Sequence, residues 1–255
     1  MTDDKKSEMF TLPNLENQAN RDSVTMVESR AVAVVAVIVY ACVCMTFACR
    51  GRLLRSGGLT SQDKQTIVDL HNQMRSQVAS GRIQGQPAAA NMLEMVWDEE
   101  LARKAQEWAN RCQNGHDSST ARRVSRFAVG QNIASTWSSP HPNRLGSQPD
   151  FNTQIAAWFN EVYQYRGGFS HGTGHYSQMV WGETYLVGCG YSYYQDGSRY
   201  TKLYICNYGP AGNVLGHSPY RQGAPACARF GTSPSRRFPG LCEPRGAYSQ
   251  SYYYG

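Results

Sequence analysis

The sequence predicts an α+β fold in which several helices pack against a small antiparallel sheet. Three segments repeat apolar residues at helical spacing, and two aromatic-rich segments flank a turn dipeptide in the manner of a β-hairpin. The chain has 255 residues, of which 41% are hydrophobic and 17% charged. This length and composition suit one folded domain with extensions at its ends.

The first two predicted helices each follow a residue that can cap their free amides. Thr60 or Ser61 caps the first helix, and the carboxylate of Asp98 caps the second. The apolar stripe of the first helix consists of Ile67, Leu70, Met74 and Val78. That of the second consists of Leu101, Ala105, Trp108, Ala109 and Cys112.

The third predicted helix runs from Phe151 to Tyr163, and a hairpin follows it. The buried stripe of this helix consists of Ile155, Trp158, Phe159 and Val162. The two strands of the hairpin span about 185–194 and 200–208, and they flank Asp196-Gly197, a dipeptide typical of tight hairpin turns.

Changes in composition divide the chain into five parts. Residues 1–30 form a polar segment, 31–49 an apolar segment, and 50–59 a basic, glycine-containing linker. Residues 60–222 form the folded domain, and 223–255 form a cysteine-containing, tyrosine-rich C-terminal extension.

The apolar segment 31–49 has no charged residue over 19 positions, which is close to the shortest length that spans a bilayer. As a signal anchor it would give a type II single-pass protein with the folded domain outside the cell. As a signal peptide it would be cleaved before Cys49, and translation from Met26 would give it a conventional length. Both interpretations remain open.

The charges around this segment conflict with an external domain. Arg50, Arg52 and Arg55 follow the segment, and the positive-inside rule places such residues in the cytosol. The cysteines, in contrast, favour a domain outside the cell. Apart from Cys42 and Cys44 in the apolar segment, the chain has an even number of them, which in a secretory context indicates disulfides. We therefore expect an extracellular domain, which touches a membrane only through residues 31–49 if these are retained.

The net charge of +6 fits a partner with an anionic surface. The basic residues are scattered, and no block of lysine and arginine of the nucleic-acid-binding type occurs. Nucleic acid is therefore excluded as the expected partner.

Two dense motifs carry a resemblance to a known family. They are Gly-His-Tyr-Ser-Gln-Met-Val-Trp at 174–181 and Tyr-Ile-Cys-Asn-Tyr-Gly-Pro-Ala-Gly-Asn at 204–213, separated by Val-Gly-Cys-Gly at 187–190. Together with His-Asn-Gln-Met-Arg at 71–75 and Gly-Gln-Asn-Ile at 130–133, they resemble the CAP superfamily of cysteine-rich secretory, antigen-five and pathogenesis-related proteins. The resemblance covers about residues 62–222 and implies a three-layer α-β-α sandwich.

The resemblance also implies a central cleft in which two histidines and two glutamates converge. The matching positions in this chain are His116, Gln131, Glu161 and His175. We predict that the two imidazoles face each other in one hollow, with Glu161 beside them. Gln131 departs from the family, which has glutamate there, and a neutral amide cannot act as a general base.

Several chemical activities can be weighed against these residues. His116 and His175 are the candidate ligands for Zn²⁺ or Mg²⁺, but catalytic zinc usually has three protein ligands, so no cofactor is required and no catalytic residue is assigned. Ser170 lies in a G-x-S-x-G pattern without the preceding strand and following helix that a nucleophile elbow needs.

An aromatic loop precedes the histidine-bearing motif, where sterol-binding members of the family have one. It contains Tyr163, Tyr165 and Phe169. Aromatic faces can cover a flat apolar ligand, so the loop predicts binding of a sterol or a fatty acid.

Three disulfides are expected. Cys189 with Cys206 matches a family disulfide, Cys227 with Cys242 would close a C-terminal loop, and Cys112 would then pair with Cys49. The expected function is therefore that of a secreted or membrane-tethered, non-enzymatic protein that binds small apolar ligands or partner proteins. The alternatives are a metal-dependent hydrolase or protease that uses the histidine and glutamate cleft, and a module for protein recognition alone, as in immune modulation.

Overall fold

The structure is a computed structural model that describes residues 49–142 and 146–245. The predictions for the polar segment and for the apolar segment up to Ala48 lie outside the described residues. Residues from Cys49 onward form one compact unit.

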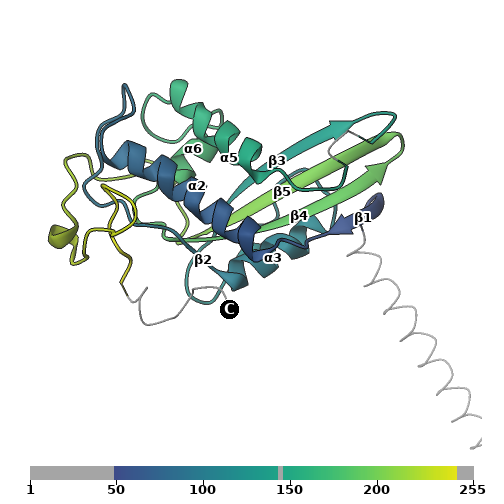
Figure 1. Cartoon of the computed structure of the whole chain (residues 1–255), viewed down its shortest axis with the longest axis horizontal. Helices are drawn as coiled ribbons and strands as arrows, with labels where there is room; N and C mark the ends of the chain where they lie inside the picture. The colour runs from purple at the N-terminus through teal and green to yellow at the C-terminus, as the bar shows by residue number, and fades with distance from the viewer. Residues whose placement is uncertain (1–48, 143–145, 246–255) are drawn as a thin grey trace, which may run out of the picture. The chain divides into compact units, whose positions relative to one another are not determined.

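The centre of this unit is an open five-stranded sheet (Figure 1). Its strands are β1 (Arg52–Ser56), β2 (Val96–Trp97), β3 (Gly130–Ser138), β4 (Leu186–Asp196) and β5 (Arg199–Gly209). The order β1-β4-β5-β3 is antiparallel throughout, and the two-residue β2 pairs with β4 in parallel. The expected sheet is therefore present, with one short parallel addition.

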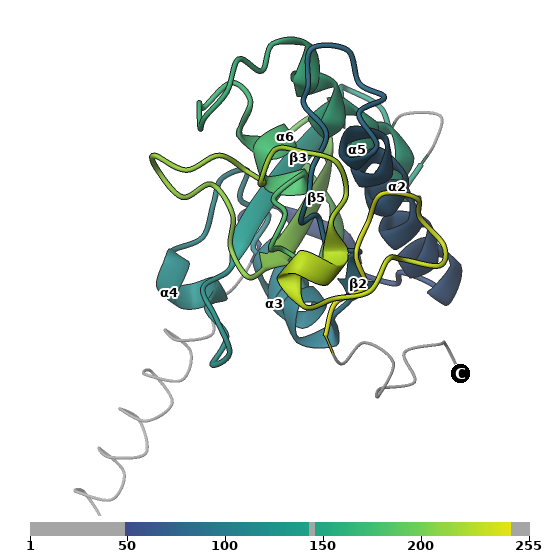
Figure 2. The ribbon, with the colours of Figure 1, turned by 90° about the vertical axis from the view of Figure 1, so that its left-hand side faces the viewer.

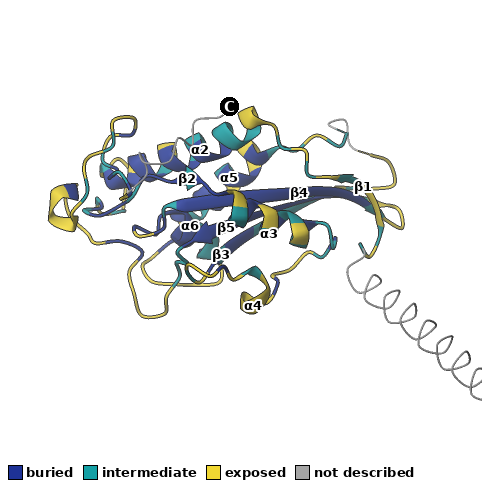
Figure 3. Ribbon diagram, turned by 90° about the horizontal axis from the view of Figure 1, so that it is seen from below, coloured by how far each residue is buried: buried dark blue, intermediate teal, exposed yellow. Residues whose placement is uncertain are grey.

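Helices cover both faces of the sheet. They are α2 (Ser61–Ala79), α3 (Glu99–Ala109), α4 (Ser119–Arg122), α5 (Phe151–Asn160) and α6 (Gly174–Met179), with 3₁₀ turns η1 (Glu161–Tyr163) and η2 (Cys227–Phe230). Helix α3 lies on one face, and α2, α5 and α6 lie on the other (Figures 1 and 2). In Figure 3 the buried strands run between these two layers. The α+β class and the three-layer sandwich are confirmed.

The predicted caps begin the first two of these helices. Thr60 and Asp63 form a capping box at α2, in which each side chain bonds the backbone amide of the other residue. At α3, Asp98 accepts a hydrogen bond of 2.9 Å from the amide of Leu101. The third predicted helix is α-helical to Asn160 and continues to Tyr163 as η1.

The motif at 71–75 has a structural role in α2. Arg75 is buried, and its five N–H groups donate at 2.6–3.0 Å to four main-chain carbonyls, those of Leu93, Met179, Trp181 and Thr184. The Asn72 side chain bonds both backbone groups of Met95, at 2.7 and 2.8 Å. These bonds attach α2 to the loop before β2 and to the segment after α6.

The glycines of the 187–190 motif let α3 lie directly on β4. A Cβ on Gly188 would overlap the backbone of Asp98 and Ala102, and a Cβ on Gly190 would overlap that of Ala105 and Gln106. Glycine is therefore required at both positions by helix–sheet contact.

The folded unit is longer than the predicted domain at both ends. Residues 50–59, predicted to be a linker, contain β1, and Leu53 pairs with Tyr194 of β4. Residues 223–245 pack against the rest of the unit, since the amide of Cys242 donates to Met92 at 2.8 Å and Leu241 is buried in the main core. The prediction of a linker at 50–59 is wrong because β1 is short and mostly exposed, and lacks the apolar alternation of a half-buried strand.

The described residues contain three disulfides, Cys49–Cys112, Cys189–Cys206 and Cys227–Cys242, which are the expected pairs. The hairpin turn centres on Gly197-Ser198, one residue later than predicted, because Asp196 already pairs with Arg199. No helix within 49–142 and 146–245 is long and apolar enough to cross a bilayer.

Candidate functional site

His175 forms the first of two histidine pairs. It lies in α6 and its Nδ1 is 2.6 Å from Oε1 of Glu161 in η1. The second carboxylate oxygen, Oε2, accepts a bond of 3.0 Å from the amide of Tyr176. The imidazole stacks on Trp158 with ring centroids 5.9 Å apart, and Trp158 Nε1 donates to the carbonyl of Ile133 on β3. The ring of His175 is thus held near the free edge of β3.

The second pair joins His116 to Gln131. Nδ1 of His116 is 2.8 Å from Oε1 of Gln131, which lies on β3. Nε2 of Gln131 donates at 3.0 Å to Oδ1 of Asn207, whose Nδ2 donates at 3.3 Å to the carbonyl of Leu101 in α3. A carbonyl can only accept, so this chain fixes the orientation of both amides. Oε1 of Gln131 therefore accepts a hydrogen bond from Nδ1–H of His116.

These partners also fix the tautomer of both neutral imidazoles. Each Nδ1–H donates to an oxygen, of Gln131 for His116 and of Glu161 for His175. In each ring the lone pair then lies on Nε2. This is the arrangement of metal-binding histidines, whose other nitrogen is held by a hydrogen-bond acceptor.

The two pairs are attached to neighbouring residues of β3 whose side chains point to opposite faces. Gln131 pairs across from Asn207 and bonds toward the α3 layer. Asn132 points to the other layer, where its Nδ2 donates to the carbonyl of His175 at 3.1 Å. The structure thus brings Glu161 to His175 and Gln131 to His116. The opposition of the two imidazoles in one hollow stays a prediction.

The donor atoms do not fit a three-ligand metal centre. Both oxygens of Glu161 are engaged, and Oε1 of Gln131 is bonded to His116. Within residues 49–142 and 146–245, no group of three or more His, Cys, Asp or Glu side chains is placed to hold a metal ion. At most the two Nε2 atoms, one from each pair, are available as ligands.

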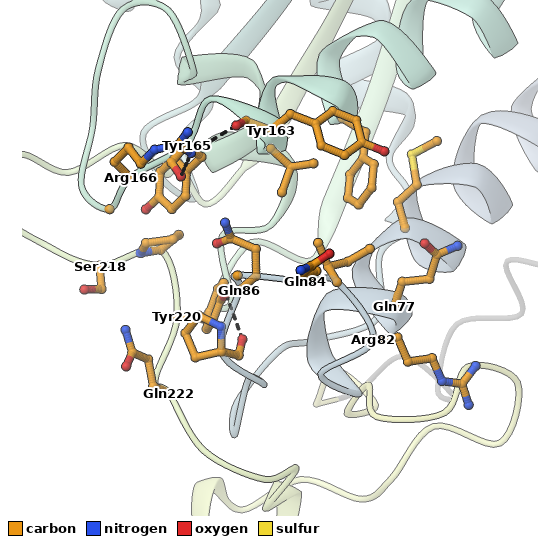
Figure 4. A pocket seen from close by; sticks show the side chains of 18 of the residues that line it. Gln77, Arg82, Gln84, Gln86, Tyr163, Tyr165, Arg166, Ser218, Tyr220 and Gln222 are labelled. Atoms are coloured by element: carbon orange, nitrogen blue, oxygen red, sulfur yellow. Dashed lines mark hydrogen bonds between the residues drawn. The ribbon is translucent and has the colours of Figure 1, made fainter.

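A separate cavity of about 940 Å³ lies between the C-terminal half of α2, the loop 82–87, η1 and the segment 218–222 (Figure 4). Its apolar lining comes from Met74, Ile83, Phe159, Val162, Tyr165 and Tyr220. Glutamine side chains and two arginines, Arg82 and Arg166, supply most of its polar lining, and no Asp or Glu among the described residues lines it. Sequence reasoning missed this cavity because its walls are distant along the chain and share no periodic pattern.

Only part of the predicted aromatic loop lines this cavity. Tyr163 and Tyr165 line it, and Figure 4 shows both on the wall formed by η1 and the loop after it. Tyr163 is 76% exposed at the rim, whereas Tyr165 is buried and its ring packs 5.1 Å from that of Tyr176. Phe169 is not a lining residue, and its ring lies 5.4 Å from that of His171.

The opposite wall of the cavity is held together by a hydrogen bond from a tyrosine. Oη of Tyr220 donates to the carbonyl of Pro87 at 2.9 Å and so joins the segment 218–222 to the loop 82–87. Burial raises the pKa of Tyr220 to about 12, and burial also raises the pKa of Tyr165. Both phenols are therefore neutral at physiological pH, and the arginines supply the only charge of the lining.

Ser170 is not placed as a nucleophile. It lies in the loop between η1 and α6, and its Oγ is bonded to Oγ1 of Thr173 at 2.7 Å. No histidine bonds its hydroxyl among the described residues.

Comparison with known proteins gives one consistent result. Residues 68–208 match the family described as "Cysteine-rich secretory protein family", CAP. Salivary antigen-5 of Dipetalogaster maximus is 40% identical over 197 residues, which cover 75% of this chain and 78% of that protein. A cysteine-rich venom protein of Tityus serrulatus is 40% identical over 199 residues, but the match spans only 47% of its length.

Solved structures agree. The structure of BmVAL-1 superposes with a TM-score of 0.64 at 30% identity, covering 78% of this chain and 99% of that one. The crystal structure of NaASP2 with Zn²⁺ gives a TM-score of 0.58 at 29% identity, covering 72% of this chain and 97% of that one.

Proposed function

The chain belongs to the CAP family of cysteine-rich secretory proteins, and from this premise we propose that it is an extracellular binding protein whose cavity holds a small amphipathic lipid. The cavity of about 940 Å³ is the observation that carries the proposal. Its volume is within the range of about 300–1,000 Å³ typical of small-ligand sites. We propose binding rather than catalysis, and the lack of a nucleophile or of a third metal ligand at either histidine pair of the described residues supports this.

The charge of the lining selects between the two lipid classes. Arg82 and Arg166 give it a positive character, and no acidic side chain opposes them. A guanidinium binds a carboxylate through charge-assisted hydrogen bonds, whereas the hydroxyl of a sterol gains no such interaction. A fatty acid is therefore the favoured ligand, with its chain along Phe159 and Val162.

Arg166 is already oriented for this role. It donates to the carbonyls of Tyr163 and Tyr165, at 3.0 and 3.1 Å, through the same nitrogen, Nη1. A guanidinium has five N–H donors, so donors remain for a ligand carboxylate. These hydrogen bonds therefore hold the cation of Arg166 beside the two tyrosines of the cavity wall.

Equilibrium binding of labelled palmitate and cholesterol to the purified full chain tests the proposal. Ile83→Trp, which fills the cavity from a loop, should weaken the binding of either lipid. Arg82→Ala with Arg166→Ala should weaken palmitate alone, by about tenfold for the loss of a charge-assisted pair. Arg123→Ala, at an exposed position outside the cavity, is the control. Absence of saturable binding of both lipids would overturn the proposal and leave protein recognition as the function of this fold.

The extracellular location is supported by three disulfides and by relatives named for saliva and venom. Both N-terminal interpretations, cleavage before Cys49 and retention as an anchor, are compatible with this location. N-terminal sequencing of the product made by eukaryotic cells distinguishes them. A product that begins at Cys49 is secreted, and a product that keeps residues 1–48 is anchored.

Metal binding is the second candidate, since two imidazoles present Nε2 lone pairs and the similar NaASP2 structure is named as containing Zn²⁺. Two ligands favour a weak site for Zn²⁺ rather than a catalytic one. Calorimetric titration of the full chain with Zn²⁺ tests it, with His175→Ala and His116→Ala each expected to abolish binding. Binding that survives both variants would exclude this site.

A further inference from the structure

We propose that one end of the folded unit is a docking surface for bilayers that contain anionic phospholipids. The surface is formed by exposed side chains of β1 and of the residues just before it, of the end of β3 and of the start of β5, and we call it the docking end. Its members are Arg50, Arg52, Leu53, Leu54, Trp137 and Arg199. This inference is independent of the ligand in the cavity, whose walls lie at the opposite end of the unit (Figure 1).

Strand register places two of the apolar members, Leu53 and Trp137, in one row. Leu53 of β1 pairs with Tyr194, Tyr194 pairs with Thr201, and Thr201 pairs with Trp137 of β3. Directly paired residues project from the same face, and neighbouring strands are about 4.8 Å apart, so the row spans about 14 Å. Its two outer members, Leu53 and Trp137, are 38% and 58% exposed, whereas Tyr194 between them is buried.

An arginine side chain lies over the tryptophan of this row. The guanidinium of Arg199 lies over the indole ring of Trp137, 4.2 Å from its centroid. Tryptophan with a neighbouring arginine is the composition of membrane-interface anchors, because the ring prefers the headgroup region and the cation meets phosphate. An exposed tryptophan of this kind has no role in the core of the domain.

Two of the three arginines that follow the apolar segment are available to bind anionic headgroups. Arg55 is engaged within the fold, where it donates to Gln148 at 2.8 Å. Arg50 and Arg52 are exposed at the docking end, close in sequence to Leu53. The exposed acidic residue at the hairpin, Asp196, is outnumbered there by the arginines. Beside an anionic membrane surface, each such arginine contributes about 1 kcal/mol of attraction.

The described chain begins at the same end of the folded unit. Cys49 is bonded to Cys112, just beyond the end of α3, and β1 begins at Arg52. In the sequence, the apolar segment is therefore followed directly by residues of the docking end. A cleaved product presents the same surface for reversible binding.

Tryptophan quenching by brominated lipids tests the inference on the full chain, in whichever form cells deliver it. The protein is reconstituted in, or mixed with, phosphatidylcholine vesicles with and without phosphatidylserine. We expect quenching that requires phosphatidylserine and disappears in Trp137→Phe. Trp108→Phe, at a half-buried position on α3, should retain it. Quenching that persists unchanged in Trp137→Phe would overturn the inference.

The charge contribution is measured on the same vesicles. Arg52→Gln and Arg199→Gln should each raise the phosphatidylserine content needed for half-maximal quenching, and for a cleaved product each should weaken vesicle binding about fivefold. Arg229→Gln, at an exposed position in η2, should have no effect. Quenching equal in phosphatidylcholine alone, or insensitive to both arginines, would also contradict an anionic docking surface.

Discussion

Gln131 accepts a hydrogen bond from Nδ1–H of His116, and its own amide N–H donates a hydrogen bond to Asn207. The glutamine amide can do both, whereas an ionised glutamate has no proton to donate. Asn207 cannot reverse its orientation, because its Nδ2 donates to the carbonyl of Leu101. The glutamine at this position, where the family has glutamate, is therefore matched to its neighbours on β5 and α3.

Gln131→Glu should lower the free energy of unfolding by about 1–3 kcal/mol, because a carboxylate oxygen would then face Oδ1 of Asn207 without a proton between them. Protonation of the introduced carboxylate, at a pH below the ordinary glutamate pKa of about 4.3, would restore a donor, so the loss should shrink in acid. Urea denaturation at pH 7 and pH 4 measures both effects. Equal stability of the two proteins at pH 7 would show that this hydrogen-bond chain does not set the residue type.

His116 and His175 should both be in the Nδ1–H tautomer when neutral, because each Nδ1 has an acceptor oxygen within 2.8 Å. Long-range ¹H–¹⁵N correlation spectra at pH 8 report the tautomer of each ring directly. Glu161→Ala should mix the tautomers of His175 and leave His116 unchanged, since the two pairs share no hydrogen bond among the described residues. An Nε2–H tautomer of either ring in the wild-type protein would contradict this assignment for that ring.

The parts of the fold that sequence reasoning predicted are those with local signals. The caps Thr60 and Asp98 act within one helical turn, and the turn between β4 and β5 needs only neighbouring residues. Strand β3 was not predicted because it lies at a sheet edge, where polar residues such as Gln131 and Asn132 replace the alternation of a half-buried strand.

For the candidate site, motif placement predicted candidate residues but not the hydrogen bond between His116 and Gln131. The bond between His116 and Gln131 depends on the register of β3 with β5, which brings Asn207 opposite Gln131. The cavity depends on contacts between the loop 82–87 and Tyr220, more than 130 residues apart. Such long-range contacts leave no periodic trace in the sequence.

Gly190→Ala should destabilise the protein by about 3 kcal/mol, because its new Cβ would overlap backbone atoms of α3 that cannot move without separating helix from sheet. Gly172→Ala is the matched control, since a Cβ there meets nothing within 4 Å and the residue has no positive φ. Thermal unfolding of both variants tests the difference. A loss of stability in Gly190→Ala no larger than in Gly172→Ala would show that α3 does not need this close approach.

His71 should make stability depend on pH between about 4 and 6.5. It is fully buried, with Nδ1 donating to the carbonyl of Ile67 at 2.7 Å and Nε2 accepting from Oη of Tyr208 at 2.9 Å. Burial, with a smaller contribution from the nearby Arg75, lowers the pKa of His71 to about 4. Burial raises the pKa of Tyr208, which keeps its phenol protonated as the donor.

The direction of the effect follows from proton binding in the two states. The unfolded chain, with a histidine pKa near 6.5, binds a proton that the folded chain refuses until about pH 4. The contribution of His71 is therefore complete above pH 6.5 and falls as the pH drops to 4, by about 3 kcal/mol in total. Free energies of unfolding from urea titrations at pH 7, 5.5 and 4 measure this slope. His71→Gln, which cannot titrate, should be less stable at pH 7 but lose less stability on acidification, and an identical slope in both proteins would assign the acid sensitivity to other groups.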